Sequence, residues 1–300
     1  MLNVQNITKK YGNLSAVSNV SFSLKRGEVL AIIGKNGAGK STIFKSILKF
    51  ITPDTGTIKF NGTDISDKSK DLIGYMAEER GLFSSMTIEQ VVLYFSELHS
   101  YDKKKAQKNL PKWMQLLDVK GKTTDKVSSL SKGNQQKVQL ITTLIHEPEL
   151  LILDEPFSGL DPVNTDRLIQ LLLTLKKKGT TILFSSHNME NVDKISDQIM
   201  LLVDGKTVLS GNLFAVRESF GRRNLYIENG YTYQDAYDLD GVTRVTKDDP
   251  GIIISFADTI HAQRALDAAL KRFKITGFRL SSPNLNEIFK IMTENKSNDS

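Results

Sequence analysis

The sequence predicts an α/β protein with a largely parallel core sheet, followed by a smaller second α/β domain. Three short apolar or β-branched runs, 29–33, 150–153 and 180–184, alternate with segments of helical periodicity. Buried parallel strands are almost continuously apolar, and strands that alternate with helices indicate such a sheet. The apolar periodicity lapses around 211–223, and strand-like runs resume beyond it. The boundary between the two domains is therefore expected there.

Composition and charge narrow the function classes. The 300 residues include no cysteine, which excludes disulfides and cysteine-ligated metal sites, and we find no membrane-spanning apolar stretch or secretory signal. Residues 1–211 hold 28 Lys and Arg against 22 Asp and Glu, whereas residues 212–300 hold 12 of each. We interpret the lysine runs 103–105 and 176–178 as solvated helix faces and expect no nucleic-acid partner. These features are typical of a soluble cytoplasmic enzyme that handles phosphates.

The first domain combines strand, hairpin and helix signals. Residues 54–56 open a β-like pair that Asn61-Gly62 interrupts, and Asn-Gly is a strong hairpin signal. A polar helical pattern covers 87–117 and another covers 164–178. A last strand-like run follows at 198–203.

The second domain is expected to be a small α/β sandwich of about 80 residues, long enough to fold alone. Its predicted strands are 224–228, 242–246, 252–256 and 275–280, and its predicted helices are 261–272 and one that opens near Pro283. The polar end of the chain, 295–300, is expected to fray.

A glycine-rich motif follows the first buried strand. Residues 34–41, Gly-Lys-Asn-Gly-Ala-Gly-Lys-Ser, fit the phosphate-binding pattern G-x-x-x-x-G-K-[ST] in full. Glycines let backbone N–H groups turn onto phosphate oxygens, Lys40 adds a cation beside the β- and γ-phosphates, and Ser41 offers a hydroxyl to Mg²⁺. The predicted nucleotide-binding residues of this loop are Asn36, Gly37, Ala38, Gly39, Lys40, Ser41 and Thr42.

Two adjacent carboxylates follow the second buried strand. Asp154 is expected to hold Mg²⁺, directly or through water, and Glu155 is expected to orient or deprotonate an attacking water. The alternative is a strand followed by a solvated acidic turn. The phosphate loop elsewhere in the chain favours the catalytic interpretation.

Four further motifs lie along the chain before, between and after the phosphate loop and the acidic pair. They are Lys9-Lys10-Tyr11-Gly12, Leu130-Ser131-Lys132-Gly133-Asn134-Gln135-Gln136, Ser158-Gly159-Leu160-Asp161 and Ser185-Ser186-His187. With the phosphate loop and the acidic pair, they resemble the ATPase subunits of ABC transporters over residues 1–211. The resemblance implies an ABC-type ATPase domain at 1–211, with a mixed sheet and a helical subdomain at about 87–145. The ending Pro283-Asn284-Leu285-Asn286-Glu287-Ile288-Phe289 resembles the C-terminal accessory domain of one branch of this family, which implies such a domain at 212–300.

The resemblance assigns a role to each motif. Tyr11 would stack on adenine, with core packing as the alternative, and His187 would join Glu155 in catalysis, with a structural histidine as the alternative. Ser131 and Gly133 would bind the γ-phosphate of an ATP held by a second subunit, where a helix N-terminus favours an anion. The predicted dimer interface comprises Ser131, Lys132, Gly133 and Asp161.

Three positions depart from the family pattern. The signature, usually Leu-Ser-Gly-Gly-Gln, has Lys132 at its first glycine and Asn134 at its glutamine. Lys132 could add a cation near the phosphate or point to solvent. Glu78 occupies the position of another family glutamine and can still approach Mg²⁺ or its water. The expected metal ligands are Ser41, Asp154 and Glu78.

These variants resemble a branch of bacterial ATPases that serve exporters. Membership would imply an ATP-hydrolysing subunit that uses ATP and Mg²⁺ and works as a dimer, a homodimer in preference to a heterodimer. A separate integral-membrane permease would hold it at the cytoplasmic face of the membrane. The alternatives are a weakly hydrolytic regulatory subunit and a soluble ABC ATPase unrelated to transport. Glu155 and His187 argue against the first alternative, and the single cassette argues against the second.

An apolar cluster follows Glu78. Leu82, Phe83 and Met86 lie in a loop-like stretch where burial within one chain is not assured. We expect this surface to receive the permease, because exposed apolar clusters commonly mark partner sites. The alternative is that the three side chains pack beneath the helical segment.

Overall fold

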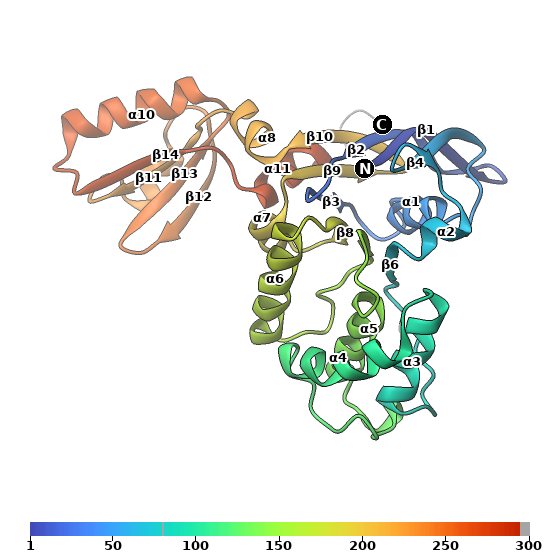
Figure 1. Cartoon of the computed structure of the whole chain (residues 1–300). Helices are drawn as coiled ribbons and strands as arrows, with labels where there is room; N and C mark the ends of the chain where they lie inside the picture. Colours follow the sequence, from blue (N-terminus) through green and yellow to red (C-terminus); the bar gives the residue numbers. More distant parts are fainter. Residues whose placement is uncertain (80, 295–300) are drawn as a thin grey trace. The chain divides into compact units, whose positions relative to one another are not determined.

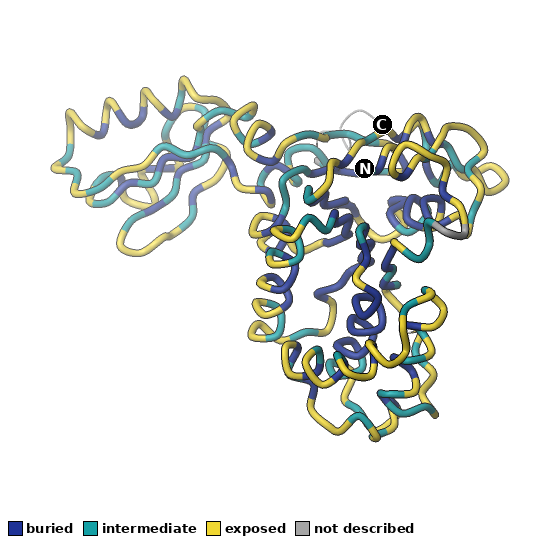
Figure 2. Tube along the Cα trace, in the orientation of Figure 1, coloured by how far each residue is buried: buried dark blue, intermediate teal, exposed yellow. Residues whose placement is uncertain are grey.

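The computed structural model describes residues 1–79 and 81–294, and the terminal segment 295–300 that was predicted to fray lies outside them. The chain has an α/β fold and divides into two units, Met1–Ser210 and Gly211–Ser300. Each unit contains its own cluster of buried apolar residues. Figure 2 colours the buried stretches of both units dark blue. The units are therefore described separately.

A six-stranded sheet forms the centre of the first unit, with the strand order β10-β9-β3-β8-β7-β6 (Figure 1). Its strands are β3 (Val29–Ile33), β6 (Ile73–Met76), β7 (Leu150–Leu153), β8 (Thr181–Ser186), β9 (Gln198–Val203) and β10 (Lys206–Asn212). The pairs β3–β8, β3–β9, β7–β8 and β6–β7 are parallel. Strands β3, β7 and β8 are buried along their whole length, as in other parallel sheets. The predicted largely parallel core sheet is confirmed.

A second, antiparallel sheet has the order β2-β1-β4-β5. Its strands are β1 (Leu2–Tyr11), β2 (Leu14–Leu24), β4 (Thr55–Phe60) and β5 (Thr63–Asp64). Phe60 pairs with Thr63 across the turn, and Asn61 and Gly62 have positive φ angles of 52° and 83°. Two successive positive φ angles define the tight hairpin turn that Asn-Gly favours, so the predicted hairpin is confirmed.

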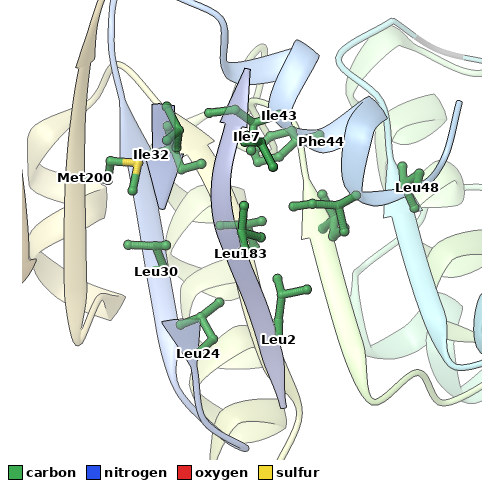
Figure 3. Close-up of a cluster of buried hydrophobic side chains, with 14 of the residues drawn as sticks. Leu2, Ile7, Leu24, Leu30, Ile32, Ile43, Phe44, Leu48, Leu183 and Met200 are labelled. Atoms are coloured by element: carbon green, nitrogen blue, oxygen red, sulfur yellow. The ribbon is translucent and has the colours of Figure 1, made fainter. Parts of the chain in front are cut away.

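The main core of the first unit joins both sheets to α1 (Lys40–Ile47). Ile7 of β1, Ile32 of β3 and Phe44 of α1 all contribute buried side chains to this core (Figure 3). Because Ile43, Phe44 and Ile47 are buried, α1 is fixed by one face from its first turn onward. The core therefore positions the loop between β3 and α1.

The remaining helices of the first unit include a helical group between β6 and β7. The helices are α2 (Asp67–Lys70), α3 (Ile88–Leu98), α4 (Lys103–Leu116), the 3₁₀ helix η1 (Val127–Ser129), α5 (Lys132–Leu144), α6 (Pro162–Lys177) and α7 (Met189–Ile195). The single pattern predicted at 87–117 is two helices, because Ser100 takes a left-handed φ of 54° and Asp102 caps a new helix by accepting from the Lys105 N–H. Helices α3, α4 and α5 contact one another.

The second unit is built on an antiparallel sheet of order β12-β13-β11-β14. Its elements are α8 (Leu213–Ser219), β11 (Asn224–Glu228), α9 (Tyr233–Tyr237), β12 (Val242–Asp248), β13 (Gly251–Phe256), α10 (Thr259–Arg272), β14 (Gly277–Ser281) and α11 (Leu285–Glu294). Ala262 and Leu266 of α10 pack against Leu225 and Ile254 of the sheet.

Helix α8 lies in the segment 211–223, where the apolar periodicity lapses and the domain boundary was expected. Asn212 caps the helix by accepting from the Ala215 N–H, and Leu213 and Val216 are buried. Its four apolar residues, 213–216, are consecutive, so the segment shows no helical apolar period. The one sequence signal for this helix is Asn212, a residue type that is favoured at helix N-caps.

His99 and His146 form a stacked pair that the sequence does not reveal. Their ring centroids lie 3.8 Å apart and their planes differ by 1°. His99 ends α3, His146 follows α5, and only 6% of His146 is exposed. Burial, the larger cause, and the neighbouring His99 together lower the pKa of His146 to about 3.

We expect the free energy of unfolding to fall as the pH is lowered from 6.5 towards 3. Native His146 stays neutral in this window, whereas the unfolded chain takes up a proton near the ordinary pKa of 6.5, so acid favours the unfolded state. The loss approaches about 1.4 kcal/mol for each pH unit. Urea denaturation of the wild type and of His146→Phe, each at pH 7.5 and pH 5, checks this. An equal loss in both proteins would contradict it.

Candidate active site

The loop between β3 and α1 depends on glycine at two positions. Gly39 has a φ of 105°, and a Cβ there would lie 2.3 Å from the carbonyl oxygen of Ala16. A Cβ on Gly34 would lie 2.6 Å from the carbonyl oxygen of Leu202. The loop therefore approaches its neighbours more closely than any residue with a side chain permits.

Lys40 provides a buried cation on the inner side of this loop. Its Nζ donates to the carbonyl oxygens of Gly34 at 2.7 Å and Lys35 at 3.2 Å. Lys40, Ser41 and Thr42 form the first turn of α1, whose leading N–H groups have no partner within the helix. A cation, unpaired N–H groups and the positive end of a helix together suit a phosphate group.

Asp154 lies at the end of β7 and is held by two serine hydroxyls. Ser41 Oγ donates to Asp154 Oδ2 at 2.7 Å, and Ser185 Oγ donates to Asp154 Oδ1 at 2.6 Å. The Glu155 N–H donates to the same Ser185 Oγ at 2.8 Å. Ser185 thus links both carboxylate residues.

The role of Ser185 was missed in the sequence, although a signal was present. Leu153 of β7 pairs with Phe184 of β8, so the next residues along both strands, Asp154 and Ser185, are neighbours. Polar residues at the carboxyl ends of adjacent parallel strands are candidates for one site. The contact could not be predicted because the sequence does not show that β8 lies beside β7.

Glu155 follows Asp154 in an unusual backbone conformation and meets His187. Its φ is 48°, a left-handed value that non-glycine residues adopt mainly where the surrounding structure requires it. Its carboxylate is buried, and His187 Nδ1 lies 2.9 Å from Glu155 Oε2. An ionised carboxylate can only accept, so Nδ1 carries the proton of this bond.

The other Glu155 oxygen has no hydrogen-bond partner. Oε1 is sheltered from solvent and lies 4.0 Å from Lys40 Nζ. A polar cleft of about 420 Å³ opens beside Glu155 and His187, with Ser158 and Gly159 among its lining residues. A buried acceptor that faces a cation and adjoins a polar cleft is suited to a water or a phosphate oxygen.

The residues present fit Mg²⁺ at two of the three predicted ligands. A carboxylate and a hydroxyl already in contact, Asp154 and Ser41, form the oxygen donor set that Mg²⁺ prefers beside nucleotide phosphates. Glu78 is exposed, and no hydrogen bond or ion pair in the described parts of the chain connects its carboxylate to them. It follows β6, next to β7, and Gln139 Nε2 fixes this segment by donating to the carbonyl oxygens of Ala77 and Glu79.

Tyr11 presents an open ring at the end of β1. Its side chain is 48% exposed, and Lys9 Nζ lies 5.7 Å from the ring centroid. The alternative of core packing is therefore wrong for this chain. An exposed aromatic face is available for stacking.

The signature segment forms the start of α5. Ser131 is the N-cap, and its Oγ accepts from the Asn134 N–H at 3.4 Å and from Asn134 Nδ2 at 3.1 Å. The Lys120 N–H in turn donates to Asn134 Oδ1 at 3.0 Å. Lys132 is exposed.

The signature and the phosphate loop of one chain are not in contact. Across residues 1–79 and 81–294, no hydrogen bond or ion pair joins Ser131, Lys132 or Gly133 to the loop. The nearest neighbour of a Cβ on Gly133 would be the carbonyl oxygen of Gly159, at 4.0 Å. Asp161 caps α6 by accepting from the Asn164 N–H, and this bond lowers its pKa.

An apolar cavity of about 290 Å³ lies next to the segment that follows Glu78. Leu82 lines it together with Phe50, Tyr75 and Phe95. Phe83 is 45% exposed and contacts Tyr94 edge-on, with ring centroids 5.3 Å apart. Leu82 and Met86 are half-buried, whereas Phe83 is exposed. Packing against the helical segment therefore covers part of this cluster and leaves Phe83 open to a partner.

Among the helices of the described residues, none has the length and apolar character needed to cross a bilayer.

Comparison with known families finds two matches. The ABC transporter family matches residues 17–158, and the C-terminal domain of DrrA1-3-like ATP-binding proteins matches residues 211–293.

Comparison with curated proteins finds relatives of similar length. The chain is 35% identical over 289 residues to the uncharacterized ABC transporter ATP-binding protein YhaQ of Bacillus subtilis, covering 96% of this chain and 97% of the relative. It is 31% identical over 214 residues to the linearmycin resistance ATP-binding protein LnrL of the same organism, covering 70% of this chain and 69% of the relative.

Solved structures resemble the chain in the same way. The ATP-binding subunit of an ABC transporter matches with a TM-score of 0.69 and 30% identity, over 74% of this chain and 93% of that one. A dimeric ATP-binding cassette in a post-hydrolysis state, bound to ADP and Pi, matches with a TM-score of 0.65 and 25% identity, over 71% of this chain and 99% of that one.

Proposed function

Since the chain belongs to the family of ABC transporter ATP-binding proteins, we propose that it hydrolyses ATP to drive export of a substrate through a separate membrane permease. The observation that carries the catalytic part is the buried Glu155 carboxylate, with one oxygen bound to His187 and the other facing Lys40. The outward direction is supported by the similarity to a linearmycin resistance protein. The permease would hold the subunit at the cytoplasmic face of the membrane.

In the proposed reaction, each residue has one task. Lys40 and the first N–H groups of α1 bind the β- and γ-phosphates, and Tyr11 stacks on the adenine. Glu155 Oε1 accepts a proton from water as the water oxygen attacks the γ-phosphorus and the bond to ADP breaks. His187 holds Oε2, so that the other oxygen faces the site. Bound Mg²⁺, held by Ser41 and Asp154, would neutralise phosphate charge.

The proposed active unit is a dimer of two copies of this chain. In the described residues no hydrogen bond joins Ser131 or Gly133 to the phosphate loop of their own chain, which supports a γ-phosphate that comes from the second copy. A related cassette is dimeric when bound to ADP and Pi. Lys132, exposed beside Ser131, and Asp161 at the start of α6 would lie at this interface.

The ATPase rate tests the dimeric site directly. We expect the rate per mole of chain to rise with protein concentration until dimers saturate, because each site needs groups from two chains. Measurement of phosphate release between nanomolar and micromolar chain, with Lys40→Ala as the inactive control, checks this. A rate per mole that is constant over this range, in a sample shown by light scattering to be monomeric, would contradict the dimeric site.

The apolar cavity beside Leu82 is the proposed docking surface for the permease. It is lined by large apolar side chains, and the adjoining Phe83 and Tyr94 are 45% and 39% exposed. Exposed apolar clusters of this kind commonly become buried in a partner. The segment with Leu82 follows β6, whose last residue, Met76, pairs with Leu153 of β7. Asp154 comes directly after Leu153, so the proposed docking surface and the proposed catalytic site adjoin the same edge of the sheet.

Phe83→Asp is expected to weaken assembly with the permease by roughly tenfold or more, because each large apolar side chain that becomes buried is worth about 1.5–3 kcal/mol. ATP binding and the melting temperature should stay close to wild type, since Phe83 is already half exposed. Co-purification from membranes checks the result. Leu116→Asp, on an equally exposed apolar residue of α4, is the control. Unchanged assembly, or unfolding of Phe83→Asp, would contradict the docking surface.

We further propose that residues 212–300 form an accessory domain without catalytic work. In its described part, 212–294, no group of three or more His, Asp or Glu side chains is placed to hold a metal ion. Its helices and sheet enclose their own core around α10, which is what an added domain requires.

A further inference from the structure

The second unit contains a cavity that the ATPase function does not use. Its volume is about 280 Å³, and Arg223, Arg244 and Lys290 are among its lining residues. This volume lies near the lower end of the range for small-molecule sites, about 300–1,000 Å³. A small ligand would fill it.

One wall of the cavity is a polar row across the sheet. Strand pairing places Arg244 of β12 opposite Ser255 of β13, and Ser255 opposite Asn224 of β11. Successive residues of a strand point to opposite faces, and the adjacent row, which includes Leu225 and Ile254, belongs to the core that packs on α10. The polar row therefore faces away from that core.

The other wall is the end segment that contains α11, with Pro283, Glu287 and Lys290 among the lining residues. Among the described lining residues, Glu287 is the only acidic one, and its Oε2 already accepts from Asn224 Nδ2 at 2.7 Å and from the Asn284 N–H at 2.9 Å. This carboxylate fixes α11 to the sheet and does not pair with the cations. The described lining therefore carries three cations, Arg223, Arg244 and Lys290, and one carboxylate, Glu287, so its net charge is positive.

Arg223 supplies a donor that lacks an acceptor. Its Nη1 donates to the carbonyl oxygen of Ala257 at 3.0 Å, and its guanidinium lies 5.5 Å from the ring centroid of Phe220. Its Nη2 is sheltered from solvent and has no hydrogen-bond partner. The side chain is thus held in place with one charged N–H group unsatisfied, which is an uncommon state for a sheltered polar atom.

Arg244 and Lys290 are exposed around the same cavity. Neither forms an ion pair with a carboxylate of the described residues. Arginine forks bind carboxylate and phosphate oxygens in matching geometry, and lysine adds a point charge. The hydroxyl of Ser255, between Arg244 and Asn224 in the row, can donate as well.

From these contacts we propose that the second unit binds a small soluble oxyanion, a metabolite with a phosphate or carboxylate group. The Arg244 guanidinium contacts its oxygens, and Arg223 and Lys290, which line the same cavity, neutralise its remaining charge. The site is distinct from the phosphate loop and makes the accessory domain a ligand-binding domain.

The test uses the full chain with Lys40→Ala, which removes the phosphate-loop lysine and leaves the second unit unchanged. Inorganic phosphate and citrate are titrated by calorimetry at constant ionic strength, with chloride as the balancing anion. We expect saturable binding of at least one of them, weakened tenfold or more by Arg244→Gln and by Arg223→Gln. Arg264→Gln, on the exposed face of α10 across the sheet, is the matched control and should bind as the parent does.

Arg244→Gln keeps the test valid if Arg223→Gln does not fold, since Arg244 is exposed and makes no structural bond. Absence of saturable binding of both probes would overturn the proposal, as would equal weakening by Arg264→Gln. Vesicles of phosphatidylglycerol in phosphatidylcholine form the second arm. Binding to these vesicles without binding to either soluble probe would also overturn it, because the surface would then recognise a membrane and not a soluble anion.

Discussion

Glu155→Gln is expected to bind MgATP with near wild-type affinity and to lose turnover by about 10²–10⁴-fold, the usual contribution of a positioned general base. Glutamine keeps the size of the side chain and can still contact His187, but it cannot take a proton from water. The oxygen proposed to take the proton is Oε1, which in the described residues has no hydrogen-bond partner and lies 4.0 Å from Lys40 Nζ. The variant should accumulate as an ATP-bound dimer, because the step that releases the two copies is blocked.

Three measurements separate this outcome from general damage. Fluorescent ATP analogues report binding, phosphate release reports turnover, and light scattering reports the dimer. Glu190→Gln is the matched control, since Glu190 is an exposed glutamate that lines the same polar cleft. Wild-type turnover in Glu155→Gln would exclude Glu155 as the base. A monomer at saturating MgATP would exclude the sandwiched dimer for the isolated subunit.

Gly39→Ala is expected to lower ATP affinity by about 100-fold or more, since small displacements of a site can have effects of this size. The added methyl group would lie 2.3 Å from the carbonyl oxygen of Ala16, a backbone atom that no side-chain rotation can move. The loop would have to shift, and the N–H groups that face the phosphates shift with it. The backbone strain alone is worth about 1–3 kcal/mol.

Gly37→Ala provides the matched control for this effect. Gly37 has a similar positive φ, 82°, but a Cβ there would meet no atom within 4 Å. It should therefore show the strain of a left-handed alanine, about 1–2 kcal/mol, without the clash. Equilibrium ATP binding and urea unfolding of both variants decide the matter. Equal losses of affinity would mean that backbone conformation, and not contact with Ala16, sets the loop.

Local patterns sufficed for much of the fold. The apolar run 29–33 became β3, the Asn61-Gly62 pair became a hairpin, and the apolar positions of the phosphate-loop helix are buried. In each case a few consecutive residues decide the structure. Helix α8 was not predicted because its four apolar residues, 213–216, are consecutive and show no helical period.

The parts of the site that escaped prediction depend on strand order and packing. Ser185 reaches Asp154 only because β8 lies beside β7, and His99 meets His146 only because α3 packs on α5. The cavity with Arg223 and Arg244 likewise combines residues of different strands. Pairings between residues that are distant along the chain are not encoded in any short motif.

Asn134, which stands where the family usually has glutamine, makes the oxygen of the signature serine, Ser131, a hydrogen-bond acceptor. The Lys120 N–H can only donate, so it fixes Oδ1 of Asn134 as the acceptor and turns Nδ2 towards Ser131. Ser131 Oγ then receives two N–H groups, from the backbone and from the amide of Asn134, and its own proton has no acceptor in this relay. A series of hydrogen bonds thus runs from the Lys120 N–H through Asn134 to Ser131 at the start of α5, and Ser131 is exposed. In the proposed dimer, the aligned N–H dipoles of these hydrogen bonds favour the negative charge of the γ-phosphate bound by the second copy.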